Sequence, residues 1–453
     1  MWNKICEEIF TELIKKLNSE NIRYFVLRNY KGLPEVNEAK DIDLVVEPAK
    51  AKYAQELLKK IFKNNGLEYY DDARFDKMLC MHGMSIKNNT GIHIDIIGGY
   101  RVKGYEIYTF DELYSHVVEY KDFYVLDEFF DGVMLLVYKI FGYKNPILKD
   151  EYREEISECL KNYEDDFRRE IHKLFGIGLG NKIAHLIEDG NFDGLISIQK
   201  EFTKALKKYA RKQSLAKTIG GRIAFLWQKI DRVVIRYRKH KRVFAVLGCD
   251  GSGKSTFIDE TIKQMNKYYV NDENDNRFHV YHFRPEIIPN LGEVGEKAKV
   301  SEQDKDFEKP HRNKPANPIS SFFRIAYYTF DYIFGWQKCV RRDVHYDRYS
   351  VFDRYSYDFI VDPERSRLRL PRWMRRFFVR LTPQPGVVFI LIANADTIYS
   401  RKQELDKAEI ERQLEEYKKL GEKHKRFHFI NAERSPKEIA GEASEIILNF
   451  YAK

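Results

Sequence analysis

The sequence predicts an α/β protein whose C-terminal part contains a five-stranded parallel sheet, preceded by an α+β domain and a helical connecting region. From residue 242 onward, short apolar runs alternate with helical segments, which is typical of a parallel sheet covered by helices. Residues 20–97 combine several strands with one helix, and residues 111–240 are mostly helical. We therefore expect domains over residues 1–120, 121–241 and 242–453.

The composition favours a cytoplasmic protein. With 453 residues, 43% of them apolar and 32% charged, the chain is long enough for two or three domains that each have a core. The longest apolar runs, such as residues 387–393, are far shorter than the roughly 20 residues that span a bilayer. Acidic residues interrupt residues 1–17, which argues against a secretory signal. The five cysteines are odd in number and lack C-x-x-C spacing, as in a reduced cytosol.

The net charge of +9 is concentrated in one segment. Residues 204–242 contain fourteen Lys or Arg against one acid, so the remainder of the chain is slightly acidic. Residues 222–242 form a basic amphipathic pattern with Trp227 on the apolar side. Such a helix either lies peripherally on an anionic membrane surface, here the inner face, or packs as a connector with solvated cations. Nucleic acid is disfavoured as a partner, because the charge is confined to one helix without a recognised binding fold.

Residues 242–256, RVFAVLGCDGSGKST, join an apolar strand to the pattern G-x-x-x-x-G-K-[ST], which we call the phosphate loop (residues 248–255). Glycines permit turns in which successive N–H groups point at an anion. Lys254 offers a charge to the outer phosphates, and Ser255 offers an oxygen to Mg²⁺. A helix that begins near Ser255 adds the positive end of its dipole. The alternative is a glycine-rich turn without a ligand.

We therefore expect ATP and Mg²⁺ as cofactors. The residues predicted to bind the nucleotide in and beside this loop are Gly248, Asp250, Gly251, Ser252, Gly253, Lys254, Ser255 and Thr256.

Charged residues follow two further strands of the predicted sheet. Residues 278–283 run into HFRP, which contains Arg284, and the strand around residues 350–352 runs into FDRYSYD, with Asp353 and Arg354. The carboxyl ends of parallel strands meet at one edge of a sheet, where α/β proteins bind ligands. We expect Asp353 to organise Mg²⁺. Arg284 and Arg354 are expected to hold an acceptor phosphate and to offset charge during phosphoryl transfer.

The series GCDGSGKST, FRP and DRY, followed by an arginine-rich helical stretch, resembles thymidylate kinase and related nucleoside monophosphate kinases over residues 242–453. The resemblance implies an ATP-dependent phosphotransferase that acts on a small-molecule acceptor. It implies that Asp250 reaches an acceptor sugar hydroxyl and that Arg401 lies near the donor base. It also implies a mobile lid over residues 401–417, with Arg401, Lys402 and Arg412 as closing cations.

Several features depart from the short thymidylate kinases. A polar segment over residues 292–318, an aromatic helix over residues 320–336 and a cluster of arginines are additional. This longer pattern resembles thymidylate-kinase-like proteins associated with bacterial surface polysaccharide synthesis, which implies an acceptor other than thymidylate. The aromatic helix either belongs to the core or stacks on a base or sugar. The arginines either bind an anionic acceptor or form a solvated face; they are Arg365, Arg367, Arg369, Arg372, Arg375 and Arg376.

In the first domain, Asp41 and Asp43 alternate with apolar residues on a predicted strand, so both carboxylates point to one face. Asp95 occupies a similar alternation, IHIDII, on a later strand. Three converging carboxylates cannot all remain ionised cheaply unless cations neutralise them, and such a set can hold two Mg²⁺ ions for attack on a phosphate. We therefore expect these aspartates to be catalytic metal ligands. The alternative is a solvated acidic strand face.

The D-x-D pattern, the later aspartate and the helix between them resemble the nucleotidyltransferase superfamily that includes DNA polymerase β and the aminoglycoside nucleotidyltransferases, over residues 20–120. The resemblance implies nucleotidyl transfer. Such enzymes carry a Gly-Ser pair before D-x-D that holds the triphosphate. Here LRNYKGLP occupies that place, with Arg28 and Asn29 as the candidate substitutes.

Three interpretations of the whole chain follow. In the first, a phosphotransferase for a nucleotide or a small sugar-containing or anionic acceptor is fused to an active nucleotidyltransferase. In the second, the first domain is a catalytically inactive scaffold for the kinase. In the third, the chain is a nucleotide-dependent switch or a membrane-surface adaptor.

Overall fold

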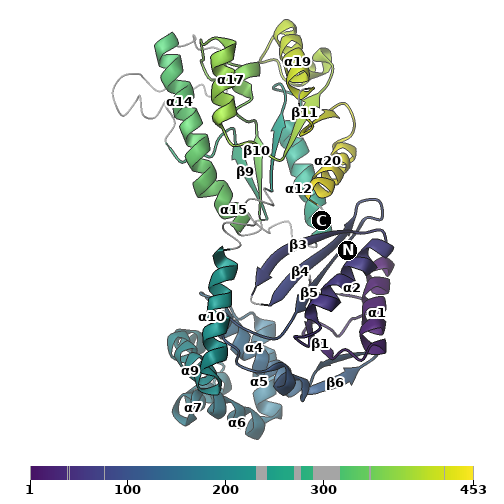
Figure 1. Cartoon of the computed structure of the whole chain (residues 1–453), viewed down its shortest axis with the longest axis vertical. Coiled ribbons are helices and arrows are strands. Elements are labelled where there is room, and N and C mark those ends of the chain that lie inside the picture. The colour runs from purple at the N-terminus through teal and green to yellow at the C-terminus, as the bar shows by residue number, and fades with distance from the viewer. Residues whose placement is uncertain are drawn as a thin grey trace. The chain divides into compact units, whose positions relative to one another are not determined.

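The computed structural model describes residues 2–37, 39, 41–75, 77–230, 242–269, 277–288, 317–345, 348–422 and 424–451. The chain divides into two compact units, Met1–Asp231 and Arg232–Ala452 (Figure 1). The first unit contains a seven-stranded mixed sheet and the second a five-stranded parallel sheet, so the predicted α/β class is confirmed. Among the described residues, no helix combines the length and the apolarity that crossing a bilayer demands.

The sheet of the first unit has the strand order β3-β4-β5-β2-β1-β7-β6. Its central strands β2 and β5 run parallel, whereas β4 runs antiparallel to β5. The strands are β1 (Tyr24–Leu27), β2 (Ile42–Val46), β3 (Glu68–Phe75), β4 (Met78–Ser85), β5 (Thr90–Ile97), β6 (Val117–Tyr120) and β7 (Phe123–Leu126).

Alternate residues of these strands face two separate cores. Ile42 and Leu44 pack in a core with α1 (Lys4–Ser19) and α2 (Ala51–Asn64), while Val45 packs on the opposite face in a core with α4 (Glu128–Gly142). The period of two therefore directs the intervening Asp43 away from α1 and α2. The other helices of this unit are α3 (Phe110–Tyr114), α5 (Asp150–Asn162), α6 (Glu164–Phe175), α7 (Ile177–Glu188), α8 (Phe192–Ser197), α9 (Gln199–Gln213) and α10 (Leu215–Ile230).

The prediction of a mostly helical segment from residue 111 is wrong for β6 and β7. These strands form an antiparallel hairpin, and Val125 of β7 pairs in parallel with Val26 of β1. The hairpin lies on both sides of residue 120, where the domain boundary was predicted. Its turn contains Lys121 in a left-handed conformation with φ of 53°. The alternating pattern VVEYKDFYVL favours strands, and pairing with β1 outweighs the helical pattern around it.

The predicted basic helix over residues 222–242 is described only in part. α10 ends at Ile230, and residues 231–241 lie outside the described residues. Within α10, Ile223, Leu226 and Trp227 are exposed. The predicted contact with an anionic membrane surface remains a prediction. The polar segment over residues 292–318 also lies almost entirely outside the described part of the chain.

The sheet of the second unit has the order β12-β11-β8-β10-β9, with every neighbouring pair parallel. β8 is central and fully buried, because helices cover both faces of the sheet. Ligands of such sheets bind where the chain leaves the central strand toward opposite sides. The strands are β8 (Val243–Leu247), β9 (Phe278–His282), β10 (Tyr349–Asp353), β11 (Val387–Ile392) and β12 (Phe427–Asn431).

The helices of the second unit pack in pairs. α12 contacts α20, and α14 contacts α17. The last helix is tied to the central strand, because the Tyr451 hydroxyl lies within hydrogen-bond distance of the backbone N–H and C=O of Val243. The elements are α12 (Lys254–Tyr268), α14 (Pro318–Gly335), a π-helical turn (Trp336–Val340), α15 (Arg341–His345), α16 (Asp358–Val361), α17 (Arg372–Leu381), α18 (Ala395–Arg401), α19 (Lys407–Gly421) and α20 (Pro436–Tyr451).

Candidate functional site

The phosphate loop follows β8 and depends on glycine at two left-handed positions. Gly251 and Gly253 have φ angles of 85° and 89°. A Cβ atom at Gly251 would also lie 2.9 Å from the carbonyl oxygen of Ile398 in α18, whereas a Cβ at Gly253 would meet no atom within 4 Å. Gly253 is therefore required by backbone conformation alone. It is the N-cap of α12 and provides no side-chain cap, so the first N–H groups of this helix remain open to an anion.

Lys254 is the first residue of α12, and its ammonium group folds back onto the loop. Nζ donates hydrogen bonds to the carbonyl oxygens of Gly248 at 3.1 Å and Cys249 at 2.9 Å. Burial, followed by the nearby guanidinium of Arg354, lowers the pKa of Lys254 to about 7. An anion in the loop would reverse this effect, because a negative charge favours the ammonium form. Ser255 and Thr256 on the same turn are exposed.

Asp353 ends β10 beside the central strand, paired in register with Val246 of β8. Its Oδ2 atom lies 3.7 Å from Nδ1 of His282. Its Oδ1 atom is buried and has no hydrogen-bond partner among the described residues. A buried carboxylate oxygen without a partner is costly, and a divalent cation is a ligand that would satisfy it. Asp353 therefore fits the role of Mg²⁺ ligand that its sequence position predicts.

Asp250, inside the loop, is held between cations. One carboxylate oxygen contacts Arg354, the other contacts Arg365, and Nζ of Lys254 lies 3.7 Å away. Arg354 is buried and also donates to Oδ2 of Asp358 at 2.8 Å. Asp250, predicted to reach an acceptor sugar hydroxyl, and Arg354, predicted to hold an acceptor phosphate, are thus brought together, and here they bind each other.

Asp358 connects this pair to α19. The Tyr417 hydroxyl of α19 donates to Oδ1 of Asp358 at 2.8 Å, so a continuous chain of side chains runs from the predicted lid to Arg354. No motif identified Asp358 or Tyr417 in the sequence. Asp358 lies four residues after Arg354, but Arg354 precedes α16 and has φ of 72°, so no helical spacing indicated this contact.

Arg284 follows β9, as predicted, but it forms a buried ion pair. It donates to Oδ2 of Asp331 in α14 at 2.8 Å and to the carbonyl oxygen of Ile288 at 3.1 Å. Asp331 also accepts the backbone N–H groups of residues 286–288. Arg284 therefore fixes the loop after β9 against α14, a contact that joins residues 47 positions apart and that no local pattern indicated.

Arg401 and Lys402 lie at the end of α18 beside the phosphate loop. A Cβ at Gly251 would lie 3.0 Å from Cβ of Lys402. The Arg401 guanidinium is exposed and donates to the carbonyl oxygen of Ala432, just after β12, at 3.2–3.3 Å. Arg412, the third predicted lid cation, pairs with Glu409 at 2.6 Å.

Two of the additional arginines contact groups of the second unit itself. Arg375 donates to the carbonyl oxygens of Phe359 and Ile360 at 2.9 and 3.0 Å, so it fastens α17 to α16. Arg365 pairs with Asp250 and Asp362. An arginine-rich sequence does not show whether its arginines contact other parts of the chain or face solvent. Some of the partners here are backbone carbonyl oxygens, which every residue has and which no sequence pattern marks.

In the first unit, Asp41, Asp43 and Asp95 converge, as the alternation predicts. One oxygen of each carboxylate lies within 4.8 Å of the others, and Asp43 pairs in register with Asp95 across β2 and β5. Burial raises the pKa of Asp43 to about 6, although Arg28 counteracts this shift, and the charges of Asp41 and Asp95 add to it. Three oxygen ligands at this spacing suit Mg²⁺.

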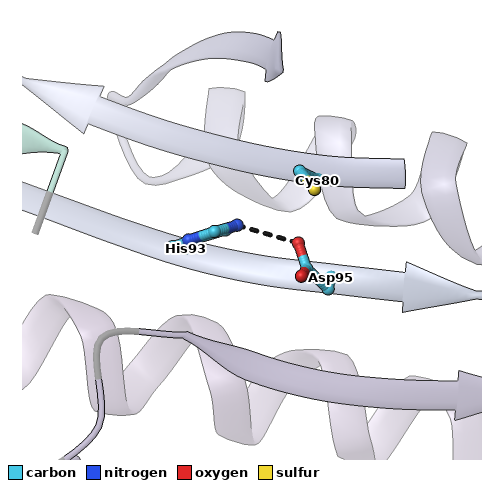
Figure 2. Close-up of side chains that lie close together, drawn as sticks. All are labelled: Cys80, His93 and Asp95. Atoms are coloured by element: carbon cyan, nitrogen blue, oxygen red, sulfur yellow. Dashed lines mark hydrogen bonds and ion pairs between the residues drawn. The ribbon is translucent and has the colours of Figure 1, made fainter. Parts of the chain in front are cut away.

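Figure 2 shows a second group of potential ligands around Asp95. Cys80 of β4 is paired directly opposite Asp95, and Nε2 of His93 lies 2.8 Å from Oδ1 of Asp95. Ligand atoms of these three residues also lie within 4.8 Å of one another. Burial alone would raise the pKa of Asp95, but His93 and Cys80 lower it, so Asp95 stays ionised. A sulfur, nitrogen and oxygen set suits a softer cation such as Zn²⁺. The alternation that placed Asp95 also places His93 on its face, whereas Cys80 depends on strand register.

Arg28 was predicted to replace the missing triphosphate-binding pair. It has φ of 60° and is followed by Asn29 with φ of 52°. Its guanidinium lies 2.9 Å from Oδ2 of Asp43 and 5.1 Å from the ring centre of Tyr138. Arg28 therefore offsets part of the charge of the aspartate cluster.

The loop geometry predicts opposite effects for two glycine substitutions in the same unit. Gly253→Ala should lower the free energy of unfolding by about 1–2 kcal/mol, because alanine is strained at a left-handed φ. Gly441→Ala, inside α20 and with open space around the added Cβ, should raise it by up to about 1 kcal/mol. Urea unfolding of both variants measures the difference. Equal effects would contradict the assignment of Gly253 as a conformational requirement.

Comparisons with known proteins assign no family to these two sites. No family model matches the chain, and no curated protein matches its sequence. The chemistry of the sites themselves must therefore carry any functional conclusion.

Proposed function

We propose that the second unit is an ATP-dependent phosphotransferase of the thymidylate-kinase-like type. The observation that carries this proposal is the unpaired, buried Oδ1 atom of Asp353, on the strand next to the phosphate loop. The side chain of Lys254 at the loop and the uncapped start of α12 add groups that can bind phosphate beside it. A cation ligand next to an anion site is the combination that a metal-bound triphosphate requires.

In this proposal, the chain contributes positioning and charge. The N–H groups of the loop and of the first turn of α12 bind the phosphates. Lys254 turns from the carbonyls of Gly248 and Cys249 to the outer phosphates, while Ser255 and Asp353 hold Mg²⁺. When bound, Mg²⁺ neutralises charge on the phosphoryl group that is transferred. Arg401, at the edge of the sheet, is proposed to lie near the base.

Asp250 and Arg354 are proposed to recognise the acceptor. An acceptor phosphate competes with Asp250 for the Arg354 guanidinium, and the released carboxylate can then accept a hydrogen bond from a sugar hydroxyl. Tyr417 and Asp358 would transmit this change to α19. The acceptor class is therefore a nucleotide or a small sugar-containing anion. The sequence resemblance suggests surface polysaccharide synthesis as the setting, and the five free cysteines support a cytoplasmic one.

The pKa of Lys254 predicts proton uptake when the nucleotide binds. At pH 8 the free side chain, with a pKa of about 7, is mostly neutral, and bound phosphate raises this pKa. Wild-type protein should therefore take up close to one proton, and its affinity should fall as the pH rises above about 7. Calorimetric titration with Mg²⁺–ATP at pH 8, in two buffers of different ionisation enthalpy, measures the uptake.

Lys254→Met should abolish this proton uptake and weaken binding by about 10- to 100-fold, the value of a hydrogen bond to a charged group. Lys263→Met, an exposed lysine of the same helix, is the matched control and should behave as wild type. Proton uptake that persists in Lys254→Met would assign the titration to another group.

Transfer itself is tested by a screen of nucleoside monophosphates, sugars and sugar phosphates for ATP consumption, with product masses recorded. Turnover should require Mg²⁺ and should fall about 100-fold or more in Asp353→Asn, because the loss of one group that stabilises transition-state charge, such as an oxyanion-hole donor, costs about 2.7–4 kcal/mol. Tight nucleotide binding without consumption by any acceptor would favour a nucleotide-dependent switch instead.

A second candidate function, nucleotidyl transfer, is favoured by the convergence of Asp41, Asp43 and Asp95. Their oxygens suit Mg²⁺, and Arg28 offsets part of their charge. Attack by an acceptor on the α-phosphate of a nucleoside triphosphate is the reaction that such a cluster supports. The alternative is an inactive scaffold.

The raised pKa of Asp43 predicts that protons compete with Mg²⁺ in the first unit. In an Asp353→Asn background, which removes the proposed metal ligand of the second unit, Mg²⁺ should raise the melting temperature little at pH 5 and more at pH 7.5, because Asp43 ionises near pH 6. Asp43→Asn should eliminate this stabilisation. Asp111→Asn, which removes an exposed carboxylate of the same unit, should retain it. Labelling of an acceptor from α-labelled nucleotide that is unchanged in Asp41→Asn/Asp43→Asn would support the scaffold.

A further inference from the structure

The helix α17 exposes two parallel rows of side chains. Trp373, Phe377 and Leu381 recur every four residues and so lie on one face, with Trp373 67% exposed and the other two about half exposed. Each is directly preceded in sequence by an arginine, so a second row runs alongside the first; it consists of Arg372, which pairs with Glu416 of α19, and of Arg376 and Arg380. No acidic residue occurs in this helix.

The helix α14 exposes a similar apolar row. Ile319 and Phe323 are 72% and 67% exposed, and Phe330 and Phe334 farther along are about half exposed. Their spacings of four, seven and four residues place them on one face of the helix. The expectation that this aromatic helix belongs to the core therefore holds only for its opposite side, where Ile325 and Tyr332 are fully buried.

A chain of aromatic contacts joins the two rows. Phe323 contacts Phe322, Phe322 contacts Phe378 of α17, and Phe378 contacts Phe377, with ring centres 5.9, 5.7 and 5.6 Å apart. α14 and α17 also pack against each other within the second unit (Figure 1). The exposed rows therefore lie on two helices that pack against each other, and we call the two rows together the aromatic surface. Exposed apolar side chains gathered in this way mark interaction sites in soluble proteins.

We propose that the aromatic surface docks the second unit onto an anionic lipid bilayer. The argument for this occupant is charge complementarity. Arg376 and Arg380 form no ion pair among the described residues, and they flank the apolar row, where lipid phosphates would meet them. Tryptophan and arginine beside exposed aliphatic and aromatic side chains are typical of helices that lie in the membrane interface.

The aromatic surface is also connected to the acceptor side of the proposed site. Arg375 of α17 binds carbonyl oxygens of α16, and Asp358 of α16 binds Arg354. The surface is thus connected to the acceptor arginine through a single short helix. This docking does not depend on phosphotransfer, so the two proposals can fail separately.

Vesicle co-sedimentation tests the proposal with the full chain. All proteins carry Ile223→Ser, Leu226→Ser and Trp227→Ser, which removes three of the exposed apolar residues of α10 and so weakens this helix as a competing contact. We expect binding to vesicles of 30% phosphatidylglycerol in phosphatidylcholine, at least tenfold weaker binding to phosphatidylcholine alone, and loss of binding in 0.5 M NaCl.

Two double variants separate the apolar and the charged contributions. Trp373→Ser/Phe377→Ser should weaken binding at least tenfold, and Arg376→Gln/Arg380→Gln should weaken it about tenfold on the anionic vesicles only. The matched controls are Ile147→Ser, which removes another exposed apolar residue, and Lys263→Gln/Lys267→Gln, which removes exposed charge from α12. Both controls should bind as the parent does. Thermal melting establishes that each variant is folded.

Binding that is unchanged in both double variants would overturn the proposal. So would light scattering that shows a dimer which Trp373→Ser/Phe377→Ser converts to a monomer, together with unchanged vesicle binding, because the surface would then be an interface between two copies of the chain.

Discussion

The ammonium group of Lys254, buried against the carbonyl oxygens of Gly248 and Cys249, is the interaction on which the second site depends. A cation at this depth is costly, and its lowered pKa records that cost. The fold tolerates it because the loop after the central strand β8 directs carbonyls inward and because β10 brings Asp353 alongside. The same arrangement leaves open N–H groups at the start of α12 and an unpaired oxygen on Asp353. In the described part of the chain, these N–H groups have no side-chain cap and this oxygen has no hydrogen-bond partner. A metal-bound phosphate would supply an anion for the N–H groups and a cation for Asp353.

The first unit also has a cluster of like charges, but there the excess charge is negative. Asp41, Asp43 and Asp95 converge on one sheet face, and a single arginine, Arg28, offsets them. Burial, with Asp41 and Asp95, raises the pKa of Asp43, whereas, despite burial, His93 lowers the pKa of Asp95, so Asp43 takes up a proton more readily than Asp95 does. In both units, therefore, like charges are buried close together, and a ligand of opposite charge would stabilise them: an anion in the second unit and a cation in the first. This shared principle does not require that the two reactions be coupled.

Local patterns predicted the parts of the molecule that depend on one strand or one turn. The apolar runs identified all five strands of the parallel sheet, and alternation placed Asp43 and Asp95 on a common face. Contacts between distant segments could not be predicted in this way. The pair of Arg284 and Asp331 joins residues 47 positions apart, and the place of Cys80 beside Asp95 depends on the register of β4. The hairpin of β6 and β7 was missed because its strands have four residues each and because only the pairing of β7 with β1 joins the hairpin to the sheet.

The most direct test is a crystal structure of the chain with Mg²⁺ and a non-hydrolysable ATP analogue. We expect the metal to be coordinated by Ser255 and held, directly or through water, by Asp353. Nζ of Lys254 should leave the carbonyl oxygens of Gly248 and Cys249 and contact the outer phosphates. An empty phosphate loop at saturating analogue, or a bound nucleotide with Lys254 still on the two carbonyls and Asp353 remote from the metal, would contradict the central claim.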